Sequence, residues 1–270
     1  MMTAERSLSF FILKIFFFLC CLFGFTACGL DEFYELDPPV RCNNQPDSNT
    51  EYATRYFEFT TNETGENNKN YIDSSSSFKF LGTAIYYKIY NNLSTMDSDI
   101  TSISTLINST NYSNAVSRIR ETLSYQELGT VKIENSQRKE TSTNPLISAQ
   151  GKNRTVYIRL TNYQDTKEFS ARILIDKEPL KDGAFELYPS RSGSNKSFDF
   201  GRTEDDKEVN VEPSQGDVDF VSGTFTEPDN KKYYVNMYAI AVGRDTTYTN
   251  YYSNALHLGS VSITATEEDN

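Results

Sequence analysis

Short stretches of alternating apolar and polar residues run through most of the chain. Phe57 and Phe59 lie on either side of Glu58, and residues 83–90 form a longer aromatic and β-branched stretch. An alternation with a period of two places every second side chain on one face, as in a half-buried β-strand. The same pattern, bounded by turn-forming residues, predicts further strands at 78–80, 130–134, 155–160, 169–175, 185–188, 197–200, 208–211, 218–225, 233–240 and 251–264.

The spacing of apolar residues becomes helical between the early and late strands. Ile100, Ile103 and Ile107 are three or four positions apart, and the same spacing returns shortly afterwards. Both segments are rich in Ser and Thr, which do not favour an isolated helix, so they should pack on a core. We therefore predict two short amphipathic helices, at 98–108 and 114–125, as a packing insertion rather than a partner-binding element.

These elements predict a mainly β fold. Helices do not alternate regularly with strands, which argues against a parallel βαβ architecture. The early strands lie before residue 93 and the longest late strands after residue 225. We expect a β-sandwich region at 51–265 with a large insertion at 93–225, or, as the alternative, two sandwiches in series divided near 179–190. Residues 266–270 would form an acidic tail.

The C-terminal strands carry a resemblance to a known family. The run from Tyr233 to Ala239, a loop and the run from Tyr251 to Leu258 resemble the final hairpin of fibronectin type III domains, and residues 82–90 resemble their third strand. The resemblance implies an immunoglobulin-like sandwich in which the Tyr233 hydroxyl bonds to nearby backbone, as in a tyrosine corner.

That family usually has a tryptophan in its core, and this chain has no Trp. Phe57 or Phe59 would have to fill the corresponding space.

The N-terminus has the plan of an exported protein. Arg6 and Lys14 precede an apolar run at 15–25, and Thr26, Ala27 and Cys28 follow it. This order of basic, apolar and small residues is typical of a secretory signal peptide. An uncleaved membrane anchor over residues 8–27 is the alternative, although the apolar run itself is shorter than the roughly 20 residues that span a bilayer.

The end of this segment resembles the lipobox of bacterial lipoproteins. Ala27 and Cys28 match its last two positions, and Phe25 in place of the usual Leu resembles the relaxed lipoboxes of spirochaete lipoproteins. The resemblance implies that residues 1–27 are removed, that Cys28 is acylated and that 28–50 form the lipidated tether. The mature protein is then expected to be anchored by lipid in the cell envelope, at the outer membrane, with the surface and periplasmic faces both open.

The net charge limits the classes of partner that the chain is expected to bind. The chain has 26 Lys and Arg against 37 Asp and Glu, a net charge of −11. Nucleic-acid binding needs clustered cations and is not expected. A negative body is also repelled by anionic headgroups, so membrane attachment should depend on the lipid. Aromatic residues make up 13% of the chain, enough to indicate a packed core rather than disorder.

The cysteines fit the same interpretation. Cys20 and Cys21 would leave with the signal peptide and Cys28 would carry lipid, so Cys42 would remain as a single thiol. We expect an inert thiol there, with an intermolecular disulfide as the alternative. No disulfide framework is available, and the fold must depend on its hydrophobic core.

Candidate catalytic groups are few. His257 is the one histidine, lies between two leucines of a predicted strand and is interpreted as a sheet-face residue rather than a base. A pair of His257 with Cys42 is not expected. Asp199-Phe200-Gly201 has the letters of a kinase magnesium motif without the rest of the kinase set.

Carboxylates are the remaining chemical candidates. Asp217 and Asp219 share a predicted strand face, and Glu227 and Asp229 follow them. Such carboxylates suggest two kinds of site, a glycoside hydrolase pair or a weak calcium site. No calcium-loop spacing is present, and acidic pairs are frequent in an acidic chain. We expect no enzyme activity, no metal and no cofactor apart from the covalent lipid.

Tyrosines on the predicted outer faces suggest recognition instead. Tyrosine offers a large contact area at small entropic cost and suits binding of proteins or sugars, whereas the plain alternative is cross-strand stabilisation. The expected function is surface binding, as an adhesin or assembly module, with host protein, envelope protein or polysaccharide as the partner. The alternatives are a periplasm-facing structural or small-ligand carrier lipoprotein and, more weakly, a carbohydrate-active enzyme. The tyrosines concerned are Tyr86, Tyr90, Tyr234, Tyr238, Tyr248, Tyr251 and Tyr252.

Overall fold

The computed structural model describes residues 34–42, 45–48, 54–72, 77–109, 113–141, 144–163, 170–192, 194–201 and 209–265. The predicted signal peptide, the lipidation site Cys28 and the acidic tail lie outside the described residues. The chain divides into two units, Met1–Tyr34 and Glu35–Asn270, and all elements below belong to the second. None of its described helices is long and apolar enough to cross a membrane.

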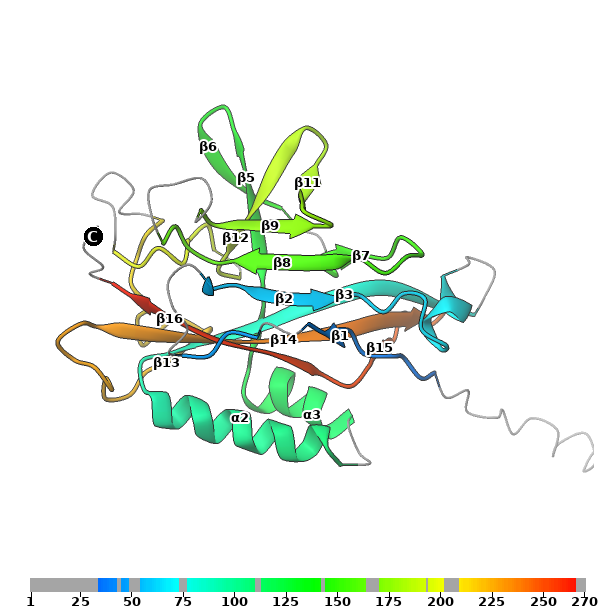
Figure 1. Ribbon diagram of the computed structural model, residues 1–270, viewed down its shortest axis with the longest axis horizontal. Helices are drawn as coiled ribbons and strands as arrows, with labels where there is room; N and C mark the ends of the chain where they lie inside the picture. Colours follow the sequence, from blue (N-terminus) through cyan, green and yellow to red (C-terminus); the bar gives the residue numbers. More distant parts are fainter. Residues whose placement is uncertain are drawn as a thin grey trace, which may run out of the picture. The chain divides into compact units, whose positions relative to one another are not determined.

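A central sheet is built on two long antiparallel strands, β3 (Phe78–Tyr90) and β14 (Lys232–Asp245). β16 (Leu256–Thr264) pairs with the other edge of β14, and β15 (Asn250–Tyr252) pairs with its last residues. The shorter strands β4 (Gln126–Glu127), β7 (Ile147–Ser148) and β13 (Phe220–Val221) pair with β3, the last of them in parallel. Figure 1 shows β3, β14 and β16 running across the middle of the molecule.

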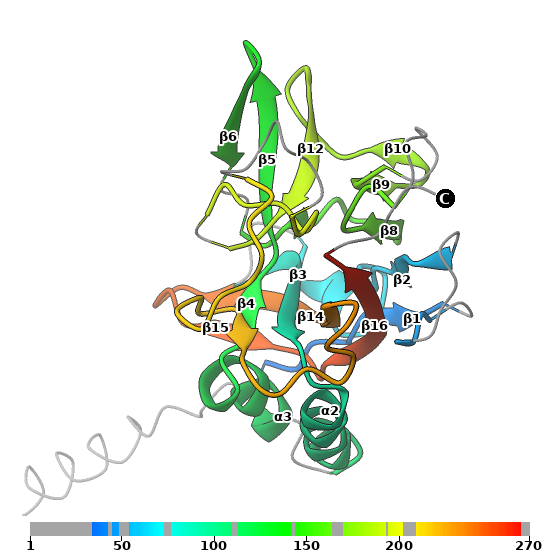
Figure 2. The same ribbon diagram turned by 90° about the vertical axis from the view of Figure 1, so that its left-hand side faces the viewer.

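Two further sheets lie on one side of the central sheet. The first has the order β1-β2-β8-β9-β10 and the second the order β11-β12-β5-β6, with antiparallel neighbours in both (Figures 1 and 2). Their strands are β1 (Val40–Arg41), β2 (Phe57–Thr60), β8 (Thr155–Arg159), β9 (Arg172–Ile175) and β10 (Glu178–Pro179), then β5 (Gly129–Glu134), β6 (Gln137–Thr141), β11 (Lys181–Asp182) and β12 (Phe185–Ser190).

The helices cover the opposite face of the central sheet. They are α2 (Leu93–Ile107) and α3 (Ser113–Ser117), which continues into the π-helical turn η4 (Arg118–Thr122). α2 starts a turn and a half before the predicted residue 98 because the Asn92 side chain accepts a hydrogen bond from the Thr95 amide at 2.9 Å. Asn is a favoured residue at this capping position.

β3 and β14 are therefore buried on both faces. Tyr87 and Val235 point into the core shared with β2 and β8, where Phe57 and Phe59 are fully buried. The intervening residues, including Tyr86, point into a second core against Ile103, Val116 and Ile119 of the helical segment. The predicted mainly β fold, with antiparallel sheets and two short helices inserted between strands, is confirmed for the described residues.

Several predicted elements are different in the structure. Residues 197–200 and 209–211 form no regular strand. Two backbone bonds join them, from the Ser197 amide to the Val209 carbonyl at 2.7 Å and from the Gly201 amide to the Asn210 carbonyl at 2.6 Å, and the Ser197 side chain bonds to that of Asn210 at 2.5 Å. The predicted strand at 218–225 shrinks to β13, whereas 78–80 and 83–90 join into one strand through Gly82. Glu35 and Leu36 are irregular, and β1 follows the two prolines Pro38 and Pro39.

Gly82 permits this continuity. Its φ of +136° is a conformation that side-chain-bearing residues rarely adopt, and an added Cβ would lie 2.0 Å from the Ile147 carbonyl oxygen. Only glycine lets β7 approach β3 so closely.

The expected tyrosine corner is wrong. The Tyr233 hydroxyl donates to the carboxylate of Glu212 at 2.9 Å, so its partner is a side chain of the preceding loop and not nearby backbone. Lys231 also contacts Glu212, at 3.2 Å.

Candidate functional site

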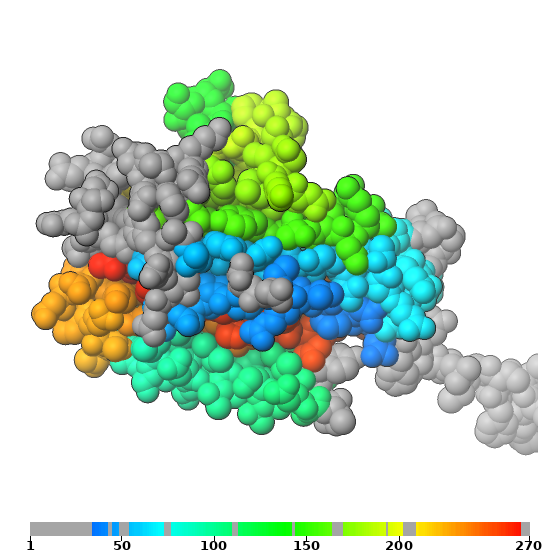
Figure 3. Space-filling model, viewed as in Figure 1, coloured from blue at the N-terminus to red at the C-terminus, as the bar shows by residue number. Residues whose placement is uncertain are grey.

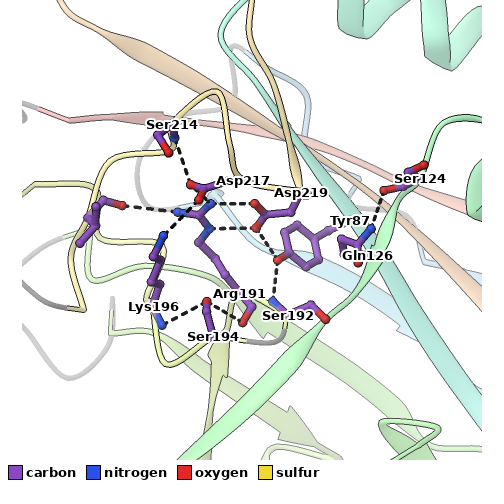
Figure 4. Close-up of polar contacts among 11 residues, drawn as sticks. Tyr87, Ser124, Gln126, Arg191, Ser192, Ser194, Lys196, Ser214, Asp217 and Asp219 are labelled. Carbon is purple, nitrogen blue, oxygen red and sulfur yellow. Dashed lines mark hydrogen bonds and ion pairs between the residues drawn. The ribbon is translucent and has the colours of Figure 1, made fainter.

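A buried ionic cluster joins three segments far apart in the sequence (Figure 4). Arg191, just after β12, donates from Nε and Nη2 to both carboxylate oxygens of Asp219 at 2.8 and 2.7 Å. Its Nη2 also lies 2.6 Å from Asp217. The Tyr87 hydroxyl on β3 donates to Asp219 at 2.7 Å and accepts from the Ser192 amide at 2.8 Å.

Asp217 of this cluster is held as a carboxylate. Burial alone would raise the pKa of Asp217, but the Ser214 amide and Arg191 outweigh it and lower the pKa to about 2. Lys196 adds a second cation at 3.1 Å. The structure brings Asp217 and Asp219 together just before β13 rather than on the predicted strand face, and both are partners of one guanidinium, an arrangement here called the Arg191 clamp.

The other acidic candidates do not join them. Glu227 forms an ion pair with Lys232 at 2.8 Å, and Asp229 is exposed in a turn. Asp199 of the kinase-like motif is buried and accepts from the Asn162 amide at 2.7 Å, which fixes a loop. Among the described residues, no group of three His, Cys, Asp or Glu side chains could hold a metal ion.

His257 takes part in a polar chain between the sheet and the helices. Its Nε2 lies 2.7 Å from Asn236 Oδ1, while Asn236 Nδ2 donates to the Tyr125 hydroxyl at 2.9 Å. The hydroxyls of Tyr125 and Tyr90 lie 3.0 Å apart, and Tyr90 donates to Asp99 of α2 at 2.9 Å. Burial, and to a smaller degree Arg41, lowers the pKa of His257 to about 4. The imidazole is thus neutral near pH 7 and donates to an amide, as a sheet-face residue would.

Cys42 is the described free cysteine. It is half-buried, and its Sγ lies 3.6 Å from the Thr60 hydroxyl across the β1–β2 pair. Its partner is Thr60 and that of His257 is Asn236, so the two residues do not form a Cys–His pair.

Most of the tyrosines predicted on outer faces are buried. Tyr86, Tyr90, Tyr234 and Tyr238 are at most 3% exposed because α2 and its successors cover that face of the sheet. The two predicted helices already indicated this burial, because a helix inserted after a strand has to cover one face of a sheet. The plain alternative, structural packing, is correct for these four residues.

Tyr248 is the exception. It lies in the loop between β14 and β15, here called the β14–β15 tip (residues 245–250), and its side chain is 81% exposed. Tyr251 and Tyr252 behind it are half-buried: Tyr251 packs edge-on against Phe78 at 5.4 Å, and Arg120 stacks over Tyr252 at 4.2 Å.

The β14–β15 tip is an ordered turn. Asp245 Oδ1 accepts from the amides of Thr247 and Thr249 at 2.9 and 2.8 Å, and the Asp245 carbonyl accepts from the Tyr248 amide at 3.1 Å. Tyr248 itself has a φ of +66°. A hairpin position of this kind normally holds Gly or Asn, because a β-carbon is unfavourable there.

The Tyr248 side chain is exposed and does not pack in the core, although its backbone conformation favours glycine. Strained backbone of this kind is concentrated at functional sites. The sequence pattern does not distinguish Tyr248 from the buried tyrosines, because it shows neither exposure nor backbone conformation.

No protein-family model, curated protein or solved structure matches this chain.

Proposed function

We propose that this chain is an exported, lipid-anchored protein of the bacterial envelope that acts by binding and not by catalysis, with the β14–β15 tip as its contact surface. The observation that carries the proposal is Tyr248, exposed and strained on an ordered turn. Tyr, Thr and Asn together suit recognition because they combine contact area with adaptable hydrogen bonds.

The described titratable clusters support a non-catalytic role. Asp217 and Asp219 face Arg191, and His257 faces Asn236. A general acid or base needs to reach a substrate proton, and these groups are engaged within the core. Their burial suits stability of the scaffold that presents the tip.

The anchor is the second part of the proposal. The lipobox resemblance at Ala27-Cys28 assigns the acylated residue, and two or more acyl chains give stable attachment where one gives only marginal binding. Growth with an alkyne-tagged fatty acid, followed by dye coupling, tests this directly. The wild-type chain and Cys42→Ala should be labelled and found with membranes, whereas Cys28→Ala should lose both properties; label retained in Cys28→Ala would refute the anchor.

The contact surface is tested in living cells. A photo-crosslinking phenylalanine analogue replaces Tyr248, and the matched control replaces Val218, which is also exposed, at 69%. Adducts of any class that form from position 248 and not from position 218 support a binding role of the tip. Equal adduct yields at both positions, or none at either, contradict it.

A further inference from the structure

The central sheet has two distinct ends. At one end Phe78, the first residue of β3, pairs with Asp245 of the β14–β15 tip. Near the other end Ile89 bonds to the carbonyl of Asp219, next to the exposed Val218. Phe78 and Ile89 are eleven residue steps apart along the extended strand, which is about 35 Å at the usual rise per residue.

The N-terminal segment enters the fold at the tip end. The Asp37 amide donates to the Asn68 side chain at 3.0 Å, and the Asp37 carboxylate accepts from the Asn67 amide at 2.8 Å. These contacts bind the segment to the 3-10 turn η3 (Asn68–Tyr71).

A chain of ring contacts then leads from η3 to the tip. Tyr71 of η3 packs against Phe78 at 4.7 Å, and Phe78 packs against Tyr251 at 5.4 Å. Figure 1 shows the first described residues, η3 and the end of β14 on the same side, and Figure 3 shows the blue N-terminal surface beside the cyan surface that follows it. The point where the chain enters the fold and the exposed Tyr248 therefore share one end.

The covalent length of the tether limits how far this end can lie from a lipid on Cys28. Seven residue steps separate Cys28 from Glu35, the first residue of the folded unit. Fully extended, they span at most about 25 Å. The tether, at about 25 Å, is shorter than the distance of about 35 Å between the two ends of the sheet. If the sheet stands upright on the membrane and Cys28 is acylated, the tip end must therefore lie nearer to the bilayer than the Val218 end.

We infer that the β14–β15 tip contacts the headgroup layer of the same membrane that holds the anchor, with Tyr248 in the interface; this rests on the proposed function. Tyrosine is enriched at membrane interfaces because its ring is apolar and its hydroxyl remains hydrated. Tyr251 and Tyr252 lie behind it with the same chemistry.

Basic side chains at this end can contact an anionic headgroup layer, although Asp37 and Glu66 also lie beside η3. Lys69 of η3 and Lys79 of β3 are exposed, and Lys79 is the cross-strand neighbour of Arg244 on β14. The Asp245 carboxylate beside them accepts the loop amides. Cations near an anionic surface each add to binding, even though the chain as a whole has a net charge of −11.

The test uses the full-length, lipidated protein in vesicles of phosphatidylethanolamine and phosphatidylglycerol. Cys42→Ser removes the free thiol, and an environment-sensitive fluorophore is attached through Tyr248→Cys or, as the matched control, Val218→Cys. Thr246→Cys provides a second reporter on the tip in case Tyr248→Cys folds poorly. Lipids with a nitroxide on the headgroup then quench any fluorophore that lies in the interface.

Because the tip would lie among headgroups, we expect about a twofold loss of emission at positions 248 and 246 and none at 218. Flotation of the vesicles reports the anchor separately. Protein that floats without selective quenching of the tip overturns this inference and leaves the anchor intact, and it assigns the tip to a macromolecular partner. Protein that does not float refutes the proposed anchor, and the inference falls with it.

Discussion

The Tyr87 hydroxyl donates a 2.7 Å hydrogen bond to Asp219, which lies 132 residues later in the chain. Burial, together with the negative charge of Asp219, raises the pKa of Tyr87 well above its usual value, so the phenol keeps the proton that this bond needs. Asp219 in turn holds Arg191, so a single carboxylate connects β3, the loop before β13 and the end of β12.

Replacing Arg191 by Met should strongly destabilise the protein. Asp219 would be left as a buried carboxylate with only Tyr87 beside it, and removing one partner of a buried ion pair costs about 3–5 kcal/mol. Urea unfolding followed by tyrosine fluorescence or circular dichroism measures the change. Lys139→Ala, which removes an exposed pair with Glu134, is the matched control and should change the free energy of unfolding by less than about 1 kcal/mol. Similar losses in the two variants would contradict the structural role of the clamp.

Acid should weaken the same cluster within a defined pH range. The pKa of Asp217 falls from 3.8 to about 2 in the folded state. A carboxylate with a lowered folded pKa contributes its stability above the unfolded pKa and loses it as the pH falls toward the folded value. The stability difference between wild type and Asp217→Asn should therefore be constant from pH 7 to about pH 5 and shrink toward pH 2. A difference that stays constant down to pH 2 would show that Asp217 is not paired in solution.

The alternation pattern predicted much of the fold because it reports the local period of side chains. The strands at β2, β5, β8, β12, β14 and β16 and both helices were found this way. It could not show that both faces of β3 and β14 are buried, because the second face is covered only by the helix that follows 78–90. Tyr86 and Tyr238 were for that reason assigned to the wrong environment.

Buried polar pairs were less predictable still. Glu63 lies 2.7 Å from Arg154 in the core and also accepts from the amide of Gly151. Neither residue stands out in the sequence, because a charged residue in a polar loop is normally solvated. The sequence shows Asp217 and Asp219 as a pair, but their partner Arg191 lies between the strands predicted at 185–188 and 197–200, outside any predicted element.

His257 provides a second pH dependence, of opposite chemical origin. Burial lowers its pKa from 6.5 to about 4, so the unfolded chain binds a proton that the folded protein does not. Stability contributed by a neutral histidine is complete above pH 6.5 and decreases as the pH falls toward 4, by up to about 3 kcal/mol. His257→Gln, which keeps a donor for Asn236, should show a smaller loss of stability between pH 7 and pH 4.5. Equal losses in both proteins would mean that His257 is protonated in the folded state.

Replacing Tyr248 by Gly tests whether the tyrosine side chain stabilises the fold at the β14–β15 tip. Its φ of +66° is unfavourable for any residue with a β-carbon, and the exposed side chain has no core contact to lose. Glycine at this position should leave the free energy of unfolding unchanged or raise it by up to about 1 kcal/mol. Tyr248→Ala retains the β-carbon and should bring no such gain. Urea unfolding of the three proteins measures this, and a clear destabilisation by glycine would mean that the ring supports the fold. Unchanged or increased stability leaves contact with a partner as the reason for a tyrosine at a position that favours glycine.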